Sequence, residues 1–338
     1  MLPVYLTAEN LDDAWHQSLY LCFKYGHAYK IEHGPYEGQT RYEFDFFSAR
    51  IKNPGQPSCL VPTMPEGTEL TPPTSKEYVQ IYFAEFLLAD VKSDKEDYRY
   101  GERLVNAKYR PLRRPDLSKP HEINGPAITL GQSVPILDLT PKDGRQPQTE
   151  EEWCEFLDRH KNPADDWEDK FKPDPFMEVA LHAEPINQVD EVIRMFAERG
   201  GETNQATMEI AMPPDILLAD SPCCRLIDCR VRSGKLHFFI YFRSWDLFSG
   251  FPANLGGMEL LKQYLVNQIR DYPNHKNPKT KLPNLENGEI FAISKGLHTY
   301  DKYAEIVEAK FGKSCEEIRT EGQVHIAIDD PSMICIGI

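Results

Sequence analysis

The chain has 338 residues, enough for one large domain or two ordinary ones, and its 41% of hydrophobic residues excludes global disorder. A formal net charge of −15 argues against binding of duplex nucleic acid through bulk charge, although a few arginines can form a local anion site. The sequence contains no apolar run of about 18 residues, so we predict no membrane-spanning helix. Eight cysteines are too few for a disulfide scaffold, and the N-terminus lacks a signal-peptide pattern, so we expect a cytoplasmic protein with reduced thiols that binds no membrane.

The N-terminal part of the chain predicts two helices, a strand and a loop. Apolar residues at helical spacing predict a helix over residues 9–30. The aromatic-rich segment 42–53 predicts a strand, and prolines and glycines in 59–75 indicate a loop. A second helix is predicted over 75–90, after a Ser/Thr cap.

The middle of the chain, at about 106–184, is rich in proline and charged residues. It is typical of an elaborated surface insertion. Two interpretations stay open: a functional or partner-binding surface, and a decoration particular to this lineage.

The C-terminal part alternates strands with amphipathic helices. Helices are predicted over 186–199, ending at Gly200-Gly201, and over 257–272. Strands are predicted over 207–212, 224–232 and 235–244, the last two joined by a Ser-Gly hairpin turn. The pattern indicates an α+β fold with a large, mostly antiparallel sheet and long helices packed on it.

Two adjacent cysteines, Cys223 and Cys224, stand directly before a predicted strand. Together with Cys229 they suggest zinc, but neither a CxxC pair nor a histidine at ligand spacing accompanies them, so we expect no metal. Adjacent cysteines do not easily bridge each other. Buried small residues and a nucleophile with a neighbour remain as interpretations.

The block RSWDLFSGFPANLGG follows the second strand of the hairpin. Arg243 offers a planar fork for phosphate and favours the thiolate of a nearby cysteine. Asp246 and Asn254 supply the directional hydrogen bonds that the edge of a heterocycle needs. This combination favours the nucleophile interpretation.

The segments SPCC and GKLHFFIYFRSWDLFSGFPANLGG resemble the thymidylate synthase family, including its pyrimidine-nucleotide hydroxymethylases. The family pattern is Pro-Cys-His, a hairpin, then Arg-Ser-x-Asp-x-x-x-Gly-x-Pro-x-Asn. The matching residues are Pro222, Cys223, Arg243, Ser244, Asp246, Gly250, Pro252 and Asn254. The resemblance implies one thymidylate synthase-like catalytic domain over 1–338, with an insertion at about 106–184, that forms a homodimer sheet to sheet.

Three further segments resemble the family in the same order. YFAEFLL places the catalytic glutamate at Glu85, YRYGERL places a site tyrosine at Tyr100, and KGLHTY places His298 and Tyr300 at the sugar 3′-hydroxyl. Structural interpretations stay open beside these roles. Glu85 would then be a paired buried acid, and Tyr100 and His298 would be structural hydrogen bonders.

The resemblance also implies the chemistry. Cys223 would add to C6 of a pyrimidine nucleoside monophosphate (dUMP, dCMP or a ribose equivalent), so that C5 accepts a one-carbon unit from 5,10-methylenetetrahydrofolate. Glu85 would move protons through water and Tyr100 would help to remove the C5 proton. Asp246 would hold the pterin, unless it is a turn or cap residue.

The substrate would be held by the remaining residues of the pattern. Arg243, with Ser244 beside it, would bind phosphate. Asn254 would read the base edge and suits uracil, whereas an aspartate there would have suggested cytosine.

Some positions depart from the family pattern. Thr203, Asn204 and Gln205 stand where partner-subunit arginines bind phosphate, and Cys224 stands where a histidine is usual. Either another arginine supplies the missing charge, or the substrate is not a simple monophosphate. The candidates are Arg41, Arg50, Arg225 and the arginines of 110–114.

These departures favour a nucleotide hydroxymethylase over a thymidylate synthase that makes dTMP from dUMP. A catalytically retired nucleotide-binding or interaction protein, and a thiol redox or zinc protein, are the hypotheses from other classes.

Overall fold

The computed structural model describes residues 3–33, 36–92, 96, 98–107, 185–218, 220–273 and 281–321. The chain divides into two compact units, Met1–Ala107 with Ile186–Ile338 and Lys108–Pro185. The expected insertion at about 106–184 falls, apart from its first two residues, outside the described part of the chain.

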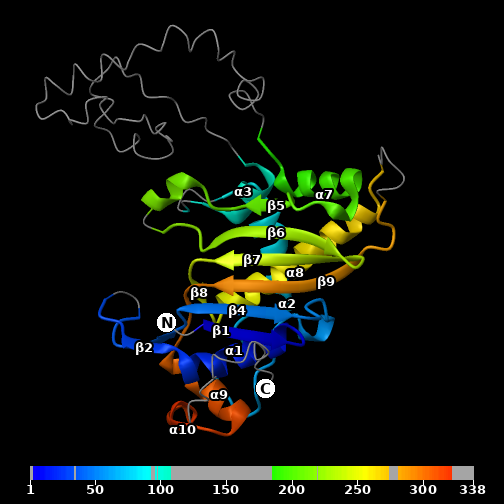
Figure 1. Cartoon of the computed structure of the whole chain (residues 1–338). Coiled ribbons are helices and arrows are strands. Elements are labelled where there is room, and N and C mark those ends of the chain that lie inside the picture. Colours follow the sequence, from blue (N-terminus) through cyan, green and yellow to red (C-terminus); the bar gives the residue numbers. More distant parts are fainter. Residues whose placement is uncertain are drawn as a thin grey trace, which may run out of the picture. The chain divides into compact units, whose positions relative to one another are not determined.

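A six-stranded mixed sheet forms the centre of the first unit, in the order β1-β4-β9-β7-β6-β5 (Figure 1). The strands are β1 Pro3–Ala8, β4 Phe46–Ile51, β9 Glu286–Ser294, β7 Lys235–Phe242, β6 Cys224–Arg232 and β5 Thr207–Glu209. Among these described strands, β1–β4 and β7–β9 are parallel and the other three pairs are antiparallel. The described sheet is therefore mixed, with antiparallel pairs in the majority.

A second sheet in the described residues was not predicted. It has the order β2-β3-β10-β8, with β2 His27–Lys30, β3 Thr40–Glu43, β10 Leu297–Tyr300 and β8 Trp245–Asp246. The predicted helix 9–30 accordingly ends early: α1 covers Leu11–Tyr25 and is capped at Gly26, and β2 begins at the next residue, His27. The predicted strand 42–53 is split between β3 and β4.

Helices cover one face of the large sheet. The long helix α8 (Gly250–Arg270) packs on β7 and β9, and α1 packs on β1 and against α8 (Figure 1). α7 (Gln188–Arg199) packs on α8 and ends at Gly200, as predicted. Alternate residues of β7 are buried under these helices, whereas those between them, such as Phe239 and Tyr241, stay half-buried. The other face of the sheet is thus partly apolar and partly exposed.

Shorter elements complete the described fold. They are α2 (Lys76–Ile81), the π-helix η2 (Tyr82–Leu87), α3 (Tyr100–Val105), α9 (Ala304–Phe311), α10 (Cys315–Thr320) and the 3₁₀ turns η1 (Pro57–Cys59), η4 (Gly200–Glu202), η5 (Pro213–Leu217) and η7 (Asp301–Tyr303). The predicted loop 59–75 is irregular after η1, and the predicted helix 75–90 is α2 followed by η2.

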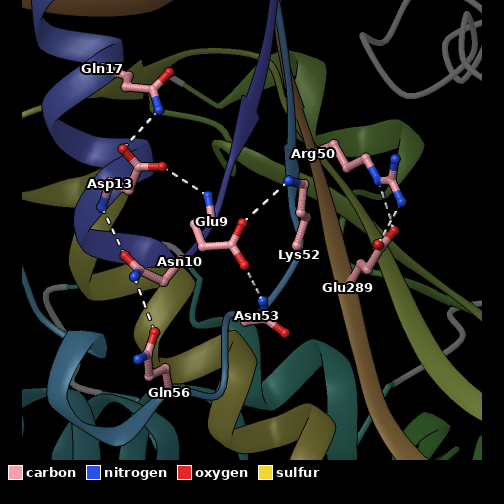
Figure 2. Close-up of polar contacts among 9 residues, drawn as sticks. All are labelled: Glu9, Asn10, Asp13, Gln17, Arg50, Lys52, Asn53, Gln56 and Glu289. Atoms are coloured by element: carbon pink, nitrogen blue, oxygen red, sulfur yellow. Dashed lines mark hydrogen bonds and ion pairs between the residues drawn. The ribbon is translucent and has the colours of Figure 1, made fainter. Parts of the chain in front are cut away.

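The start of α1 is fixed by side chains at the ends of β1 and β4 (Figure 2). The Asn10 side chain accepts a hydrogen bond from the Asp13 amide and donates to Gln56. The Glu9 carboxylate accepts from Lys52 and Asn53, the residues that follow β4. These contacts satisfy helix N–H groups and hold the parallel pair β1–β4 together at this end of the sheet.

Candidate active site

The hairpin of β6 and β7 brings Cys223 and Arg243 together. Ser233 and Gly234 adopt positive φ angles of 52° and 74°, the conformation of a tight two-residue hairpin turn, as predicted. Cys224 pairs with Phe242, so the residue before β6 faces the residue after β7. The Arg243 amide accordingly donates to the Cys223 carbonyl at 2.8 Å.

The Arg243 side chain holds the loop that precedes the nucleophile candidate. Its guanidinium donates to the carbonyls of Ser221 at 2.5 Å and Pro222 at 3.3 Å. It also pairs with the exposed carboxylate of Asp220 at 3.3 Å. The guanidinium therefore fixes the backbone beside Cys223 and is already in contact with one anionic group.

The Cys223 thiol is half-buried in a charged environment. Burial raises its pKa, and Asp220 adds to this effect, whereas the Arg243 and Arg225 guanidinium groups lower it. Burial is the largest of these effects, so the pKa lies above that of an ordinary thiol.

Cys224 has a different environment from its neighbour. Its side chain is fully buried in the core, and burial raises its pKa far above the usual range. This burial does not support the predicted contact of its thiol with substrate. Its backbone N–H donates to the Tyr100 hydroxyl at 3.0 Å.

Three tyrosines line the inner side of this loop. Burial raises the pKa of Tyr100 and Tyr82 well above the usual value, and raises that of Tyr98 to about 12. Tyr98 stacks on Tyr100 with 6.0 Å between ring centroids, and its hydroxyl is 3.5 Å from the Ser221 carbonyl. Tyr100, at the start of α3, thus lies at the cysteine pair and remains protonated at neutral pH.

The Asn254 amide is fixed by two aromatic side chains. Its Nδ2 donates to the Tyr82 hydroxyl and its Oδ1 accepts from the Trp245 indole, both at 2.8 Å. One N–H and one lone pair remain for a ligand. The sequence analysis identified neither partner. Tyr82 precedes Asn254 by 172 residues, and the contact with Trp245 depends on how β8 packs against α8.

Glu85 lies in the π-helix η2, the element that carries Tyr82. Its side chain is exposed, which overturns the interpretation as a paired buried acid. A π-helix is rare and frequently occurs at functional sites.

Asp246 caps the first turn of α8, the alternative that the sequence left open. Its Oδ2 accepts from the Ser249 amide, the Ser249 hydroxyl and the Gly250 amide at 2.5–3.1 Å. Its Oδ1 has one long contact, 3.3 Å from the Phe248 amide. Ser244 is half-buried between Arg243 and β8.

A second group lies on the small sheet. In register, Tyr300 pairs with Arg41 and His298 pairs with both Glu43 and Asp246. His298 is buried, which lowers its pKa, and its Nδ1 is 3.0 Å from the Gly296 carbonyl. The segment 243–246 connects this group to the Cys223 group.

Asn204 and Gln205 are exposed on the turn that leads into β5. Gln205 accepts a hydrogen bond from Arg199 at 2.5 Å. No contact among the described residues joins either of them to Cys223 of the same chain.

Residues of the segment 221–254 are therefore assembled with Tyr100. The comparisons with known proteins bear on the segment 221–254. A model of the thymidylate synthase family matches residues 148–320, just over half of the 338-residue chain. The chain belongs to the thymidylate synthase family. The match includes the cysteine, arginine and asparagine of the site but not Glu85, Tyr100 or Arg41.

Several curated proteins are similar to this thymidylate synthase family member. Proteins named "Putative thymidylate synthase" from Methanosarcina barkeri and Methanosarcina acetivorans are 28% and 30% identical over 36% and 37% of this chain. A thymidylate synthase from Novosphingobium aromaticivorans is 25% identical over 39% of this chain and 37% of its own length. The chain spans about half the length of the two Methanosarcina relatives.

The described residues of this family member hold no group of three or more His, Cys, Asp or Glu side chains that could bind a metal ion. In the same residues, no helix is long and apolar enough to cross a bilayer. A polar pocket of about 630 Å³ lies at the opposite end of β7 and β9, beside Lys52, His237 and Asn287. It contains none of the predicted site residues.

The residues present fit the folate that the family implies. A pterin presents N–H donors, and Asp246 keeps an acceptor oxygen, Oδ1, with a single weak contact. Glu85 is exposed on the helix whose Tyr82 reaches Asn254, and a solvated carboxylate can exchange protons through water.

Proposed function

We propose that this protein transfers a one-carbon unit from 5,10-methylenetetrahydrofolate to C5 of a pyrimidine nucleoside monophosphate, with Cys223 as the nucleophile. The observation that carries the proposal is the hairpin junction that sets the half-buried Cys223 thiol beside the Arg243 guanidinium. Membership of the thymidylate synthase family supports the reaction class.

In this mechanism Cys223 adds to C6 of the base as the thiolate. Burial keeps the thiol protonated in the free protein, and the arginines beside it favour the thiolate. Addition at C6 places negative charge on the ring and makes C5 nucleophilic. The bound folate supplies the one-carbon unit at the oxidation level of formaldehyde.

The other residues orient the base and move protons. Asn254, held by Tyr82 and Trp245, presents one N–H and one lone pair to the base edge, which fits the uracil edge where a carbonyl acceptor adjoins an imide N–H donor. Tyr100 lies within hydrogen-bond distance of the Cys224 amide, close to the nucleophile. Because it stays protonated, it helps to remove the C5 proton by holding the water that takes this proton up, and the proton then leaves through water to Glu85 or solvent in the proposal. His298 and Tyr300 hold the sugar.

We infer a hydroxymethyl product rather than a methyl product. The exposed Glu85 supports this inference, because its carboxylate leaves hydrated surroundings where the family excludes water. Cys224 adds nothing to this hydration, because its side chain is buried in the core. Water then adds to the exocyclic carbon, whereas in a thymidylate synthase reaction a hydride from the folate reaches that carbon.

The protein is proposed to act as a homodimer that pairs through the uncovered face of the large sheet. Phe239 and Phe291 stack on this face with 4.7 Å between ring centroids, and both are half-buried. Apolar side chains on a sheet face that helices do not cover favour contact with a second copy.

Release of tritium from C5-labelled dUMP, dCMP, UMP and CMP tests the function, together with product mass and dihydrofolate absorbance. We expect release from one of the four and a hydroxymethyl product without dihydrofolate. Cys223→Ala should lower release by at least about a thousandfold, because no other group replaces the nucleophile. Cys59→Ala, which removes another half-buried thiol, should leave it unchanged.

A methyl product with equimolar dihydrofolate would show a thymidylate synthase instead. No release from any nucleotide by the folded protein would overturn the proposal in favour of a catalytically retired relative.

A further inference from the structure

The family pattern predicts a phosphate site, and in this chain the positive charge expected at residues 204 and 205 is absent. Neutral Asn204 and Gln205 stand where the family pattern has arginines, and both are exposed on a turn. The nearby Arg199 is engaged by Gln205. A dianionic phosphate beside Arg243 alone would be only partly neutralised.

A β-bulge in β6 lies next to the nucleophile. Cys224 pairs with Phe242 and Leu226 pairs with Tyr241, so Arg225 is an extra residue in the strand. The amides of Ile210 and Ala211 both donate to its carbonyl, at 3.0 and 2.9 Å, which fixes the bulge. Bulges next to active sites re-aim side chains, and here the extra residue is an arginine.

The bulge directs Arg225 to the same backbone atom that Arg243 binds. Arg225 Nη1 and Arg243 Nε each lie 3.3 Å from the Pro222 carbonyl oxygen. Both guanidinium groups act on the ionisation of Cys223. A guanidinium has five N–H donors, so a single contact with Pro222 uses only part of the capacity of Arg225.

The other candidate arginines lie elsewhere. Arg50 forms a bidentate pair with Glu289, at 2.7 and 3.0 Å (Figure 2), and its strand β4 is separated from β6 by β9 and β7. Arg41 pairs with Glu43 and lies on the small sheet opposite Tyr300. The arginines of 110–114 fall outside the described residues.

We propose that Arg225 and Arg243 form a two-arginine phosphate site beside Cys223, in which Arg225 supplies the charge that Asn204 and Gln205 cannot. This proposal rests on the proposed function for the identity of the ligand, a nucleoside 5′-monophosphate. The site then discriminates a nucleotide from its nucleoside through residues of one chain.

The test compares Arg225→Gln with the matched control Arg232→Gln, which removes the same charge at the exposed far end of β6. Affinity for dUMP should fall about tenfold to a hundredfold in Arg225→Gln, as for loss of a charge-assisted hydrogen bond, and stay unchanged in the control. Affinity for deoxyuridine should change in neither variant. Arg225→Lys should recover part of the loss, because a lysine restores the charge without the fork.

A second measurement does not depend on a nucleotide. Inorganic phosphate should slow alkylation of Cys223 by iodoacetamide in the wild-type protein, relative to chloride at equal ionic strength, and should not do so in Arg225→Gln. Protection by phosphate without binding of any pyrimidine nucleotide would reject the proposed function and keep the phosphate site.

Nucleotide binding that is unchanged in Arg225→Gln would overturn the role of Arg225 and keep the proposed function. An equal loss for dUMP and deoxyuridine would also overturn it, since it would show a merely structural effect. Absence of both phosphate and nucleotide binding in the wild-type protein would reject both proposals.

Discussion

The ionisation of Cys223 depends on burial and on three charged side chains. Burial and Asp220 raise its pKa, and Arg243 and Arg225 lower it. Asp220 is 82% exposed in its side chain and pairs with Arg243 at 3.3 Å. Its carboxylate therefore both raises the thiol pKa and occupies part of the guanidinium that a ligand phosphate would use.

Asp220→Asn should lower the pKa of Cys223, because it removes a negative charge that disfavours the thiolate. The rate of alkylation at Cys223 rises with pH through this pKa, so the rate profile should move to lower pH. At a fixed pH below the pKa we expect an increase of up to about twofold, since water screens an exposed carboxylate. Peptide mass after timed labelling gives the measurement.

Asp45→Asn is the control, because Asp45 is exposed between β3 and β4. An unchanged Cys223 profile in Asp220→Asn would mean that solvent already screens the carboxylate completely.

At the scale of elements, local sequence patterns predicted the strands and turns whose formation depends mainly on residues close together in the sequence. The strand-like segments and the Ser-Gly turn predicted β6 with both its ends and β7 from its first residue, although β7 ends at Phe242, two residues before the predicted end. The bulge at Arg225 was not predictable, because it depends on a register shift against β7 and on amides from residues 210 and 211. The cysteine, arginine and asparagine of the site were readable as a motif, whereas the Tyr82 and Trp245 contacts that orient Asn254 depend on tertiary packing.

The start of α8 shows the same limit. The sequence predicts a helix from 257, but α8 begins at Gly250, because Asp246 caps it and its glycines lie where other side chains come close. A Cβ at Gly257 would lie 2.3 Å from Cδ1 of the Tyr82 ring. This glycine is therefore required for η2 to pack on α8 and for Tyr82 to reach Asn254.

Gly257→Ala should destabilise the protein by about 1–3 kcal/mol, as overpacking does, and should weaken nucleotide binding as Tyr82 moves. Gly250→Ala is the matched control, since a Cβ there meets only ordinary contacts of 3.5 Å or more. It should change stability by less than about 1 kcal/mol. Urea denaturation gives the free energy of unfolding of each variant, and equal values for the two would contradict the proposed close packing. Nucleotide affinity is measured separately.

At the scale of the whole molecule, the two faces of the large sheet differ in what covers them. α1 and α8 cover one face (Figure 1). On the other face, side chains such as those of Tyr241, Phe291 and Ile293 are only half-buried. Phe239 and Phe291 stack at its centre, on the parallel strands β7 and β9. The face presents stacked, half-buried aromatic side chains, the kind of residue that is enriched in interfaces between two copies.

Phe291→Glu should disrupt the proposed homodimer, because a charge placed near a twofold axis is buried twice without a partner. We expect the dimer dissociation constant to rise by at least about a hundredfold, as for loss of an interface hot spot. Tyr78→Glu, at an exposed aromatic on α2, should leave the dimer intact. Sedimentation equilibrium measures both variants, with Ile293→Lys as a second change on the same face.

The same variants separate the dimer from the phosphate site. Cys223, Arg225 and Arg243 belong to one chain and converge on one loop. If these arginines supply the phosphate charge, a folded Phe291→Glu monomer should keep its affinity for dUMP within about threefold of the wild-type value. A monomer that has lost dUMP binding by the factor expected of Arg225→Gln would instead assign the missing charge to the partner subunit. Circular dichroism of the variant verifies that the monomer is folded, so that either result bears on the source of the charge.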